Sequence, residues 1–188
     1  MREVMKLPFL SAIRKGIWLV LVGYTISYAE TAGISTDVFR ELILFYSSMC
    51  EGPPVENEMD IPEIKEGKWV TFHDGKKFST GECRKGKAEG VWLILHDHGG
   101  KAVEAFFREG KPEGVWRFWH YNGRKIREEE YQNGMRHGRF TMWSKYDGKE
   151  YISGTYKEDK QNGKWTYGDE KGGMEKEEVW ESGTRISP

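Results

Sequence analysis

The chain has 188 residues, a formal net charge of −1 and a sequence pI of about 6.5. A charge this close to zero gives no general attraction to phosphate backbones, which argues against a nucleic-acid-binding protein. Only 37% of the residues are apolar, but 14% are aromatic and 23 are glycine; this composition excludes a disordered chain and favours short strands joined by tight turns.

Residues 1–29 differ in composition from the rest of the chain. Basic residues precede an apolar run at 17–29, in which the small residues Ser27 and Ala29 are spaced as cleavage after Ala29 would need. This run is short for a bilayer span. We expect a signal peptide; an uncleaved membrane anchor and a buried apolar segment are the alternatives. The protein would then be exported, to the periplasm, the envelope or the medium.

Residues 30–65 form a second region. The stretch Ser35-Thr36-Asp37 predicts the start of a short helix that runs through about Ser48 with one broad apolar face. We expect this helix to cover the first edge of the sheet predicted below, because an open edge recruits other strands. The acidic, proline-containing stretch that follows, up to Lys65, is expected to be an extended linker.

Three sequence marks recur with a common period from about residue 66 to the end. Glycines spaced 23 to 25 residues apart each precede a ring by two positions: Gly67, Gly90, Gly114, Gly138 and Gly163. A second series has the same spacing: Cys83, Phe107, Tyr131, Tyr156 and Trp180. A glycine-containing turn signal lies between the two series each time. The shared period indicates five tandem repeats, at about 66–89, 90–113, 114–137, 138–162 and 163–188.

Each repeat reads as a β-hairpin. Pairs such as Asn122-Gly123 and Asp147-Gly148 separate runs of five to seven residues, and they are typical of type I′ turns, in which both central residues have positive φ. The connections between repeats, such as Glu109-Gly110, are equally short. We therefore predict an all-β fold, an elongated single-layer antiparallel meander of about ten strands.

Residue alternation divides the rings between two faces of this sheet. Trp116 and Phe118 share one side, whereas Trp119 and Tyr121 lie on the other. Tryptophan and tyrosine dominate protein interfaces, so the rings predict a contact surface for a partner protein. The predicted contacts are Trp92, Trp116, Trp119, Tyr121 and Trp143. A purely structural role is the alternative, and it is stronger for Trp92 and Trp116.

The repeats resemble the bacterial variant of the MORN-repeat family over about residues 66–188. The segments that carry the resemblance are "GVWRFWHYNGRKIREEEYQNGMRH", "GRFTMWSKYDGKEYISGTYKEDKQN" and "GVWLILHDHGGKAVEAFFREGKPE". The resemblance implies a β-hairpin array used as an interaction scaffold. Some bacterial members are antitoxin-like binders of a partner toxin, and eukaryotic arrays are linked to membrane tethering. The family offers no catalytic residues, and this chain departs from it at Cys83 and Asp159.

Motifs for metal or nucleotide chemistry are weak. His73, His96 and His120 occupy equivalent repeat positions, but such positions lie two strands, about 9.6 Å, apart, which is too far for shared zinc coordination. The stretch from Gly81 to Ala88 is similar to a phosphate-binding loop but lacks its final hydroxyl, and a strand follows where that motif needs a helix. We expect no metal and no cofactor.

Motifs for catalysis and covalent linkage are equally weak. The run Glu128-Glu129-Glu130 is expected to be solvated, because neighbouring strand residues point to opposite faces and cannot act together in acid–base work. Cys83 lacks an evident base, so its repeat position predicts packing. With Cys50 it makes one disulfide possible after export, although two free thiols are the preferred interpretation.

The sequence as a whole predicts a non-enzymatic exported scaffold that binds another protein, with an antitoxin-like role implied by the resemblance alone. The alternative is a membrane-surface module, because tryptophan beside lysine suits a phospholipid interface. Neither interpretation involves nucleic acid.

Overall fold

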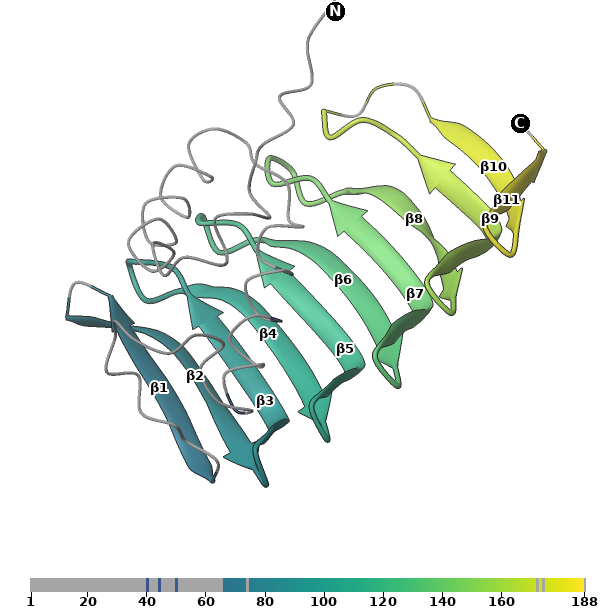
Figure 1. Ribbon diagram of the computed structural model, residues 1–188. Helices are drawn as coiled ribbons and strands as arrows, with labels where there is room; N and C mark the ends of the chain where they lie inside the picture. Colours follow the sequence, from purple (N-terminus) through teal and green to yellow (C-terminus); the bar gives the residue numbers. More distant parts are fainter. Residues whose placement is uncertain are drawn as a thin grey trace, which may run out of the picture.

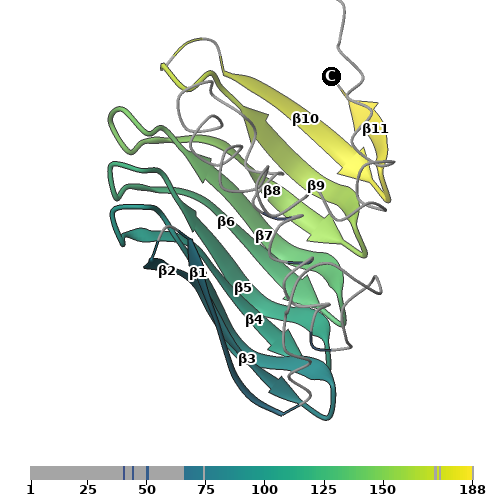
Figure 2. The ribbon, with the colours of Figure 1, turned by 60° about the vertical axis from the view of Figure 1, so that its left-hand side comes forward.

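The computed structural model describes residues 40, 44, 50, 66–73, 75–171, 173 and 175–187, without the side chains of 69 and 71–73. It contains eleven strands: β1 (Gly67–His73), β2 (Lys76–Arg84), β3 (Lys87–Leu95), β4 (Lys101–Arg108), β5 (Lys111–Trp119), β6 (Lys125–Gln132), β7 (Met135–Trp143), β8 (Glu150–Lys157), β9 (Lys160–Tyr167), β10 (Lys176–Glu181) and β11 (Thr184–Ser187). They form one antiparallel sheet in the order β1 to β11, as Figures 1 and 2 show. The predicted all-β meander is confirmed.

The structure differs from the prediction at its C-terminal end, and it describes little of the N-terminal region. The eleventh strand, β11, was not predicted; it follows a turn at Ser182-Gly183. The predicted signal peptide at 1–29 and the predicted linker at 52–65 lie outside the described residues. The predicted helix is described only at Arg40 and Leu44, both of which are helical.

The sheet has a row of turns at each end of its strands. The turns that join one hairpin to the next have two residues with positive φ, for example 52° at Asn133 and 92° at Gly134. In the hairpin loops at 96–100, 120–124 and 144–149, only the glycine has positive φ, as at Gly123 and Gly148. The prediction of type I′ turns at Asn122-Gly123 and Asp147-Gly148 was therefore wrong. Backbones of the type I′ kind join consecutive repeats instead.

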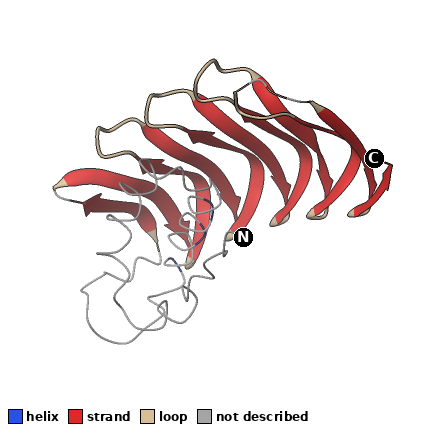
Figure 3. Ribbon diagram, turned by 90° about the horizontal axis from the view of Figure 1, so that it is seen from above, coloured by secondary structure: helices blue, strands red, loops and turns tan. Residues whose placement is uncertain are grey.

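Hydrogen bonds along the row of inter-repeat turns tie each repeat to the one before it. The amide of Gly134 donates to the carbonyl of Pro112 at 2.9 Å, and the same bond recurs from Gly110 to Ala88 and from Gly183 to Gln161. Where the series has Asp159 in place of glycine, that residue still adopts a φ of 64°. This ladder runs along the edge of the array, whose outline is curved (Figure 3).

One side of the sheet, here called the aromatic face, carries the rings that follow the opening glycines. Its buried cluster consists of Cys50, Phe78, Cys83, Ala88, Trp92, Ile94, Ala102, Val103, Ala105, Phe107, Trp116, Phe118 and Tyr131. The opening glycines have positive φ, 64° at Gly114, and the register of the sheet shifts beside them. This conformation is rarely available to other residues, which explains why glycine precedes each ring.

Small residues make room for the indoles of this face. A Cβ added at Gly81 would lie 2.1 Å from the ring of Trp92, and one at Gly154 would lie equally close to Trp165. Each ring therefore packs directly on the backbone of the preceding hairpin. The indole Nε1 of Trp165 also donates to the carbonyl of Thr155 at 3.1 Å. Tryptophan at this position joins two hairpins by both packing and hydrogen bonding.

Residues from the N-terminal region lie on the aromatic face. Cys50 and Cys83 form a disulfide with a Cα–Cα distance of 5.6 Å, so the preference for free thiols was wrong. Leu44 packs against the buried cluster, and Arg40 Nε donates to the Tyr131 hydroxyl at 2.7 Å. Cys83 belongs to β2 and Tyr131 to β6. The two described residues of the predicted helix thus lie on a face of the sheet, and the rest of that helix lies outside the described residues.

Candidate interaction surface

The other side of the sheet, here called the outer face, has a single row of paired residues that crosses ten strands. In order, the row is Val70, Thr80, Leu93, Glu104, Arg117, Glu128, Thr141, Ser153, Thr166 and Glu177. Three charged residues lie in its middle, Glu104, Arg117 and Glu128, and three hydroxyl-bearing residues follow them, Thr141, Ser153 and Thr166. The predicted contact residues of this face lie beside the charged part.

The charged part of the row is a connected network. Arg117 contacts Glu104 at 3.2 Å and Glu128 at 3.1 Å, and lysines at 101 and 125 pair with the same carboxylates. The hydrogen bond from Lys101, helped by Arg117, lowers the pKa of Glu104. For Glu128, partial burial opposes ionisation, but Lys125 and Arg117 outweigh it and lower the pKa. The network therefore stays ionised and carries little net charge.

Trp119 and Trp143 occupy equivalent positions on the outer face, one repeat apart. Lys101 Nζ lies 5.4 Å from the centre of the Trp119 ring, and Lys125 Nζ lies 4.2 Å from that of Trp143. Both rings are half-buried, and a cation lies over each. The structure thus brings together two of the predicted contact residues with the charged network, as a repeated lysine–tryptophan pair.

Tyr121 lies in the loop between β5 and β6, with 41% of its surface exposed. Its ring centre is 4.2 Å from that of His98 and 5.5 Å from that of His96. His96 is buried, and its Nε2 lies 3.2 Å from the carbonyl oxygen of Trp119. Burial lowers the pKa of His96, with His98 and His120 adding to the effect. This cluster links Tyr121 to Trp119 through one histidine.

In the part of the chain that the structure describes, no group of three or more histidine, cysteine or carboxylate side chains is placed to hold a metal ion. The similarity to a phosphate loop also fails on geometry, because Gly81 lies within β2 and β3 follows the turn at Lys85-Gly86.

Two predicted contact residues are core residues. Trp92 and Trp116 were predicted to contact a partner, but they are 1% and 0% exposed, so their rings pack in the core of this structure. Trp116 packs between Phe107 and Tyr131, with ring centres at 5.2 and 4.6 Å. The repeat position that these tryptophans share is a packing position, which leaves Trp119, Tyr121 and Trp143 as candidates.

The aromatic face contains a polar chain that sequence reasoning missed. Arg127 Nη2 lies 2.7 Å from Glu129 Oε2, and the Tyr131 hydroxyl donates to Glu129 Oε1 at 2.8 Å. The guanidinium lies 5.2 Å from the ring centres of Phe118 and Phe140. Glu129 is fully buried, so the prediction that it is solvated was wrong. Burial, together with the neighbouring Glu129 carboxylate, raises the pKa of Tyr131.

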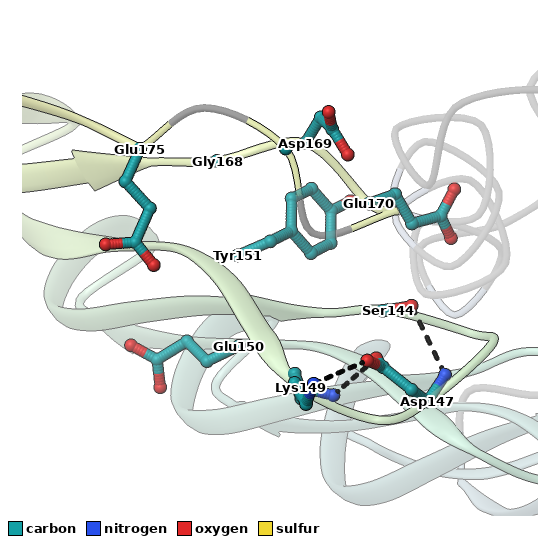
Figure 4. A pocket seen from close by; sticks show the side chains of 10 residues that line it. Ser144, Asp147, Lys149, Glu150, Tyr151, Gly168, Asp169, Glu170 and Glu175 are labelled. Atoms are coloured by element: carbon teal, nitrogen blue, oxygen red, sulfur yellow. Dashed lines mark hydrogen bonds and ion pairs between the residues drawn. The ribbon is translucent and has the colours of Figure 1, made fainter.

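A pocket of about 220 Å³ lies between the β7–β8 and β9–β10 loops, as Figure 4 shows. Five carboxylates line it: Asp147, Glu150, Asp169, Glu170 and Glu175. Tyr151, Ser144 and Lys149 also contribute to the lining. Asp147 is held by the Lys149 backbone amide and by Ser144, and these bonds lower its pKa. The long acidic turn of the fifth repeat was the available sequence signal for this pocket.

Comparison with known proteins adds no assignment: the chain matches no protein-family model and no curated protein. Within the described residues, no helix has the length and apolar character needed to cross a membrane.

Proposed function

We propose that this protein is a non-enzymatic, exported scaffold that binds a partner protein through the outer face of its sheet. The observation that carries the proposal is the repeated lysine–tryptophan pair, Lys101 with Trp119 and Lys125 with Trp143. Half-buried rings of this kind are rigid and lose little conformational entropy on binding, and tryptophan is enriched at interface hot spots.

The balance of charge around these rings supports a protein partner over a phospholipid surface. Each lysine is already paired with a carboxylate, Lys101 with Glu104 at 2.6 Å and Lys125 with Glu128 at 2.9 Å. Its three cations and two carboxylates leave this network a net charge of only +1, which gives little attraction to anionic lipid, but its exposed polar atoms suit the hydrogen-bonded rim of a protein interface. That the partner is a toxin rests on the family resemblance alone.

Crosslinking in the source cells tests the proposal. The tagged chain is compared with a Trp119→Ala, Trp143→Ala variant and with an Ile186→Ala control, because Ile186 is exposed but distant in the sheet order from both tryptophans. We expect one stoichiometric protein with the wild type and the control, and its loss with the double variant.

Recovery of the same proteins with all three chains would contradict the proposal. Sedimentation of the purified chain with vesicles of phosphatidylcholine and phosphatidylglycerol separates the rival function: co-sedimentation that depends on Trp119 and Trp143 would favour the membrane-surface module.

A further inference from the structure

Three residues of the N-terminal region, here called the strap residues, contact the aromatic face in three different ways. Cys50 is bonded to Cys83 of β2, Leu44 packs on the apolar cluster, and Arg40 donates to Tyr131 of β6. Arg40 and Leu44 are helical and four positions apart, so they lie on the same side of a helix. The strap residues therefore form a small, specific set of covalent, apolar and polar contacts.

The aromatic face needs a cover. Trp116 and Phe107 are 0% exposed, although they belong to a single sheet layer. A buried aromatic side chain removes about 150–250 Å² of surface from water, so uncovering several of them is strongly unfavourable. A chain whose strap residues have left this face must bind another apolar surface or expose these rings.

The polar chain of the aromatic face does not depend on the strap for its charge balance. Glu129 accepts hydrogen bonds from Arg127 and from the Tyr131 hydroxyl, both of which come from β6 itself. An unpaired buried carboxylate is costly in a protein interior. Removal of Arg40 does not create one, because Glu129 keeps its contact with Arg127. Apart from the Cys50–Cys83 bond, the contacts described for the strap residues are noncovalent.

We propose that the aromatic face also binds the strap residues of a second copy of this chain, so that two copies exchange straps and are joined by Cys50–Cys83 bridges between chains. The contacts are chemically the same within one chain and between two, which is the condition for low-cost exchange. The fifteen residues from 51 to 65 reach at most roughly 50 Å when extended. That reach is long enough to pass to a neighbouring molecule.

The bridge between chains forms by an ordinary thiol oxidation. The Cys50 thiol of one copy and the Cys83 thiol of the other lose two protons and two electrons as their sulfurs bond. Glutathione disulfide takes up these electrons and protons and becomes two molecules of glutathione.

Mixed isotopic labelling tests the exchange with the wild-type chain. Equal amounts of heavy and light protein are reduced, unfolded together and refolded at about 10 and 100 µM in a glutathione buffer, and disulfide-linked peptides are measured by mass spectrometry. With an effective concentration within one chain of order 1 mM, we expect heavy–light Cys50–Cys83 pairs to rise about tenfold between the two concentrations. Absence of such pairs at both concentrations would overturn the proposal.

A second labelling experiment, in which only one of the two chains keeps Arg40 and Leu44, distinguishes strap recognition from random collision of thiols. The heavy wild type is refolded with a light Arg40→Ala, Leu44→Ala variant, so two different bridges between the chains become possible. We expect the bridge from wild-type Cys50 to variant Cys83 to exceed the reverse bridge about tenfold, because only the wild-type strap keeps its contacts. Equal amounts of the two bridges would overturn the proposal, since they would show that the strap contacts do not guide pairing.

Discussion

Strands β5 and β6 carry an arginine–glutamate pair on each face of the sheet, and the two pairs have different surroundings. On the aromatic face, Arg127 and Glu129 are 2.7 Å apart, and their side chains are 5% and 0% exposed. On the outer face, Arg117 and Glu128 are 3.1 Å apart and 38% and 30% exposed. One short stretch of β6 therefore supplies a carboxylate to the core and another to the surface.

The difference shows how one residue type has two roles in a single-layer sheet. Water screens the outer pair, so each partner tolerates the loss of the other. The inner pair lies among Phe118, Phe140 and Tyr131, where an unpaired charge is expensive. The ion pair of the aromatic face is thus fixed, whereas the outer pair lies on a surface that tolerates change.

The largest expected effect is on the inner pair. Glu129→Ala leaves Arg127 buried without its carboxylate, and we expect the free energy of unfolding to fall by about 3–5 kcal/mol. Urea unfolding followed by circular dichroism measures the change. A loss below about 1 kcal/mol would show that the aromatic face is no drier than the outer one.

The next effect concerns packing on the aromatic face. Gly154→Ala places a methyl group against the Trp165 ring, where the added Cβ would lie 2.1 Å from ring carbon. We expect a loss of about 1–3 kcal/mol, as in other overpacked cores. Ser153→Ala, one residue away on the outer face, is the matched control. Equal losses in the two variants would contradict the assignment of faces.

His96, at the loop end of β3, is expected to make the stability of the protein depend on pH. Burial lowers the pKa of His96 below its usual 6.5, so the folded state resists a proton that the unfolded chain accepts. The stability linked to this residue is complete above pH 6.5 and is lost as pH falls through the lower, folded pKa. Urea midpoints measured from pH 7.5 to 4.5 should show this loss in the wild type. A His96→Gln variant with the same pH profile would contradict the account.

The smallest effect belongs to the outer pair. We expect Glu128→Ala to lower the free energy of unfolding by less than about 1 kcal/mol, and 1 M sodium chloride to reduce that difference further. The same urea assay, run at two salt concentrations, measures it. A loss as large as that of Glu129→Ala would mean that the outer network is also part of the core.

The period of the glycines and rings predicted the meander, because each repeat places the same backbone conformation at the same step. The faces were predicted less well. Strand alternation placed Trp116 and Trp119 on opposite sides, but it did not show which side is buried. The run of three glutamates at 128–130 predicted solvent exposure. The local sequence does not show that Phe118 and Phe140 of the neighbouring strands lie beside Arg127, the partner of Glu129. The turn types were exchanged because the residue before the glycine does not decide the backbone: Lys85 and Glu109 adopt positive φ, whereas Asn122 does not.

The disulfide was not the preferred prediction, because its two cysteines are far apart in the sequence. Cys83 stood out because it occupies a ring position in the repeat, but Cys50 lies 33 residues away in a region without the period. Only the placement of Arg40, Leu44 and Cys50 on the aromatic face brings the two sulfurs together. That placement arises from packing of the apolar cluster, which no local pattern encodes.

Urea unfolding of two tryptophan variants tests the central claim, the division between a buried aromatic face and an open outer face, most directly. Trp116 and Trp119 belong to the same strand and are three residues apart. We expect Trp116→Ala to lower the free energy of unfolding by about 3–5 kcal/mol and Trp119→Ala to lower it by less than about 1 kcal/mol. Losses of equal size, or a larger loss for Trp119→Ala, would contradict the division of faces and the choice of the outer face for binding.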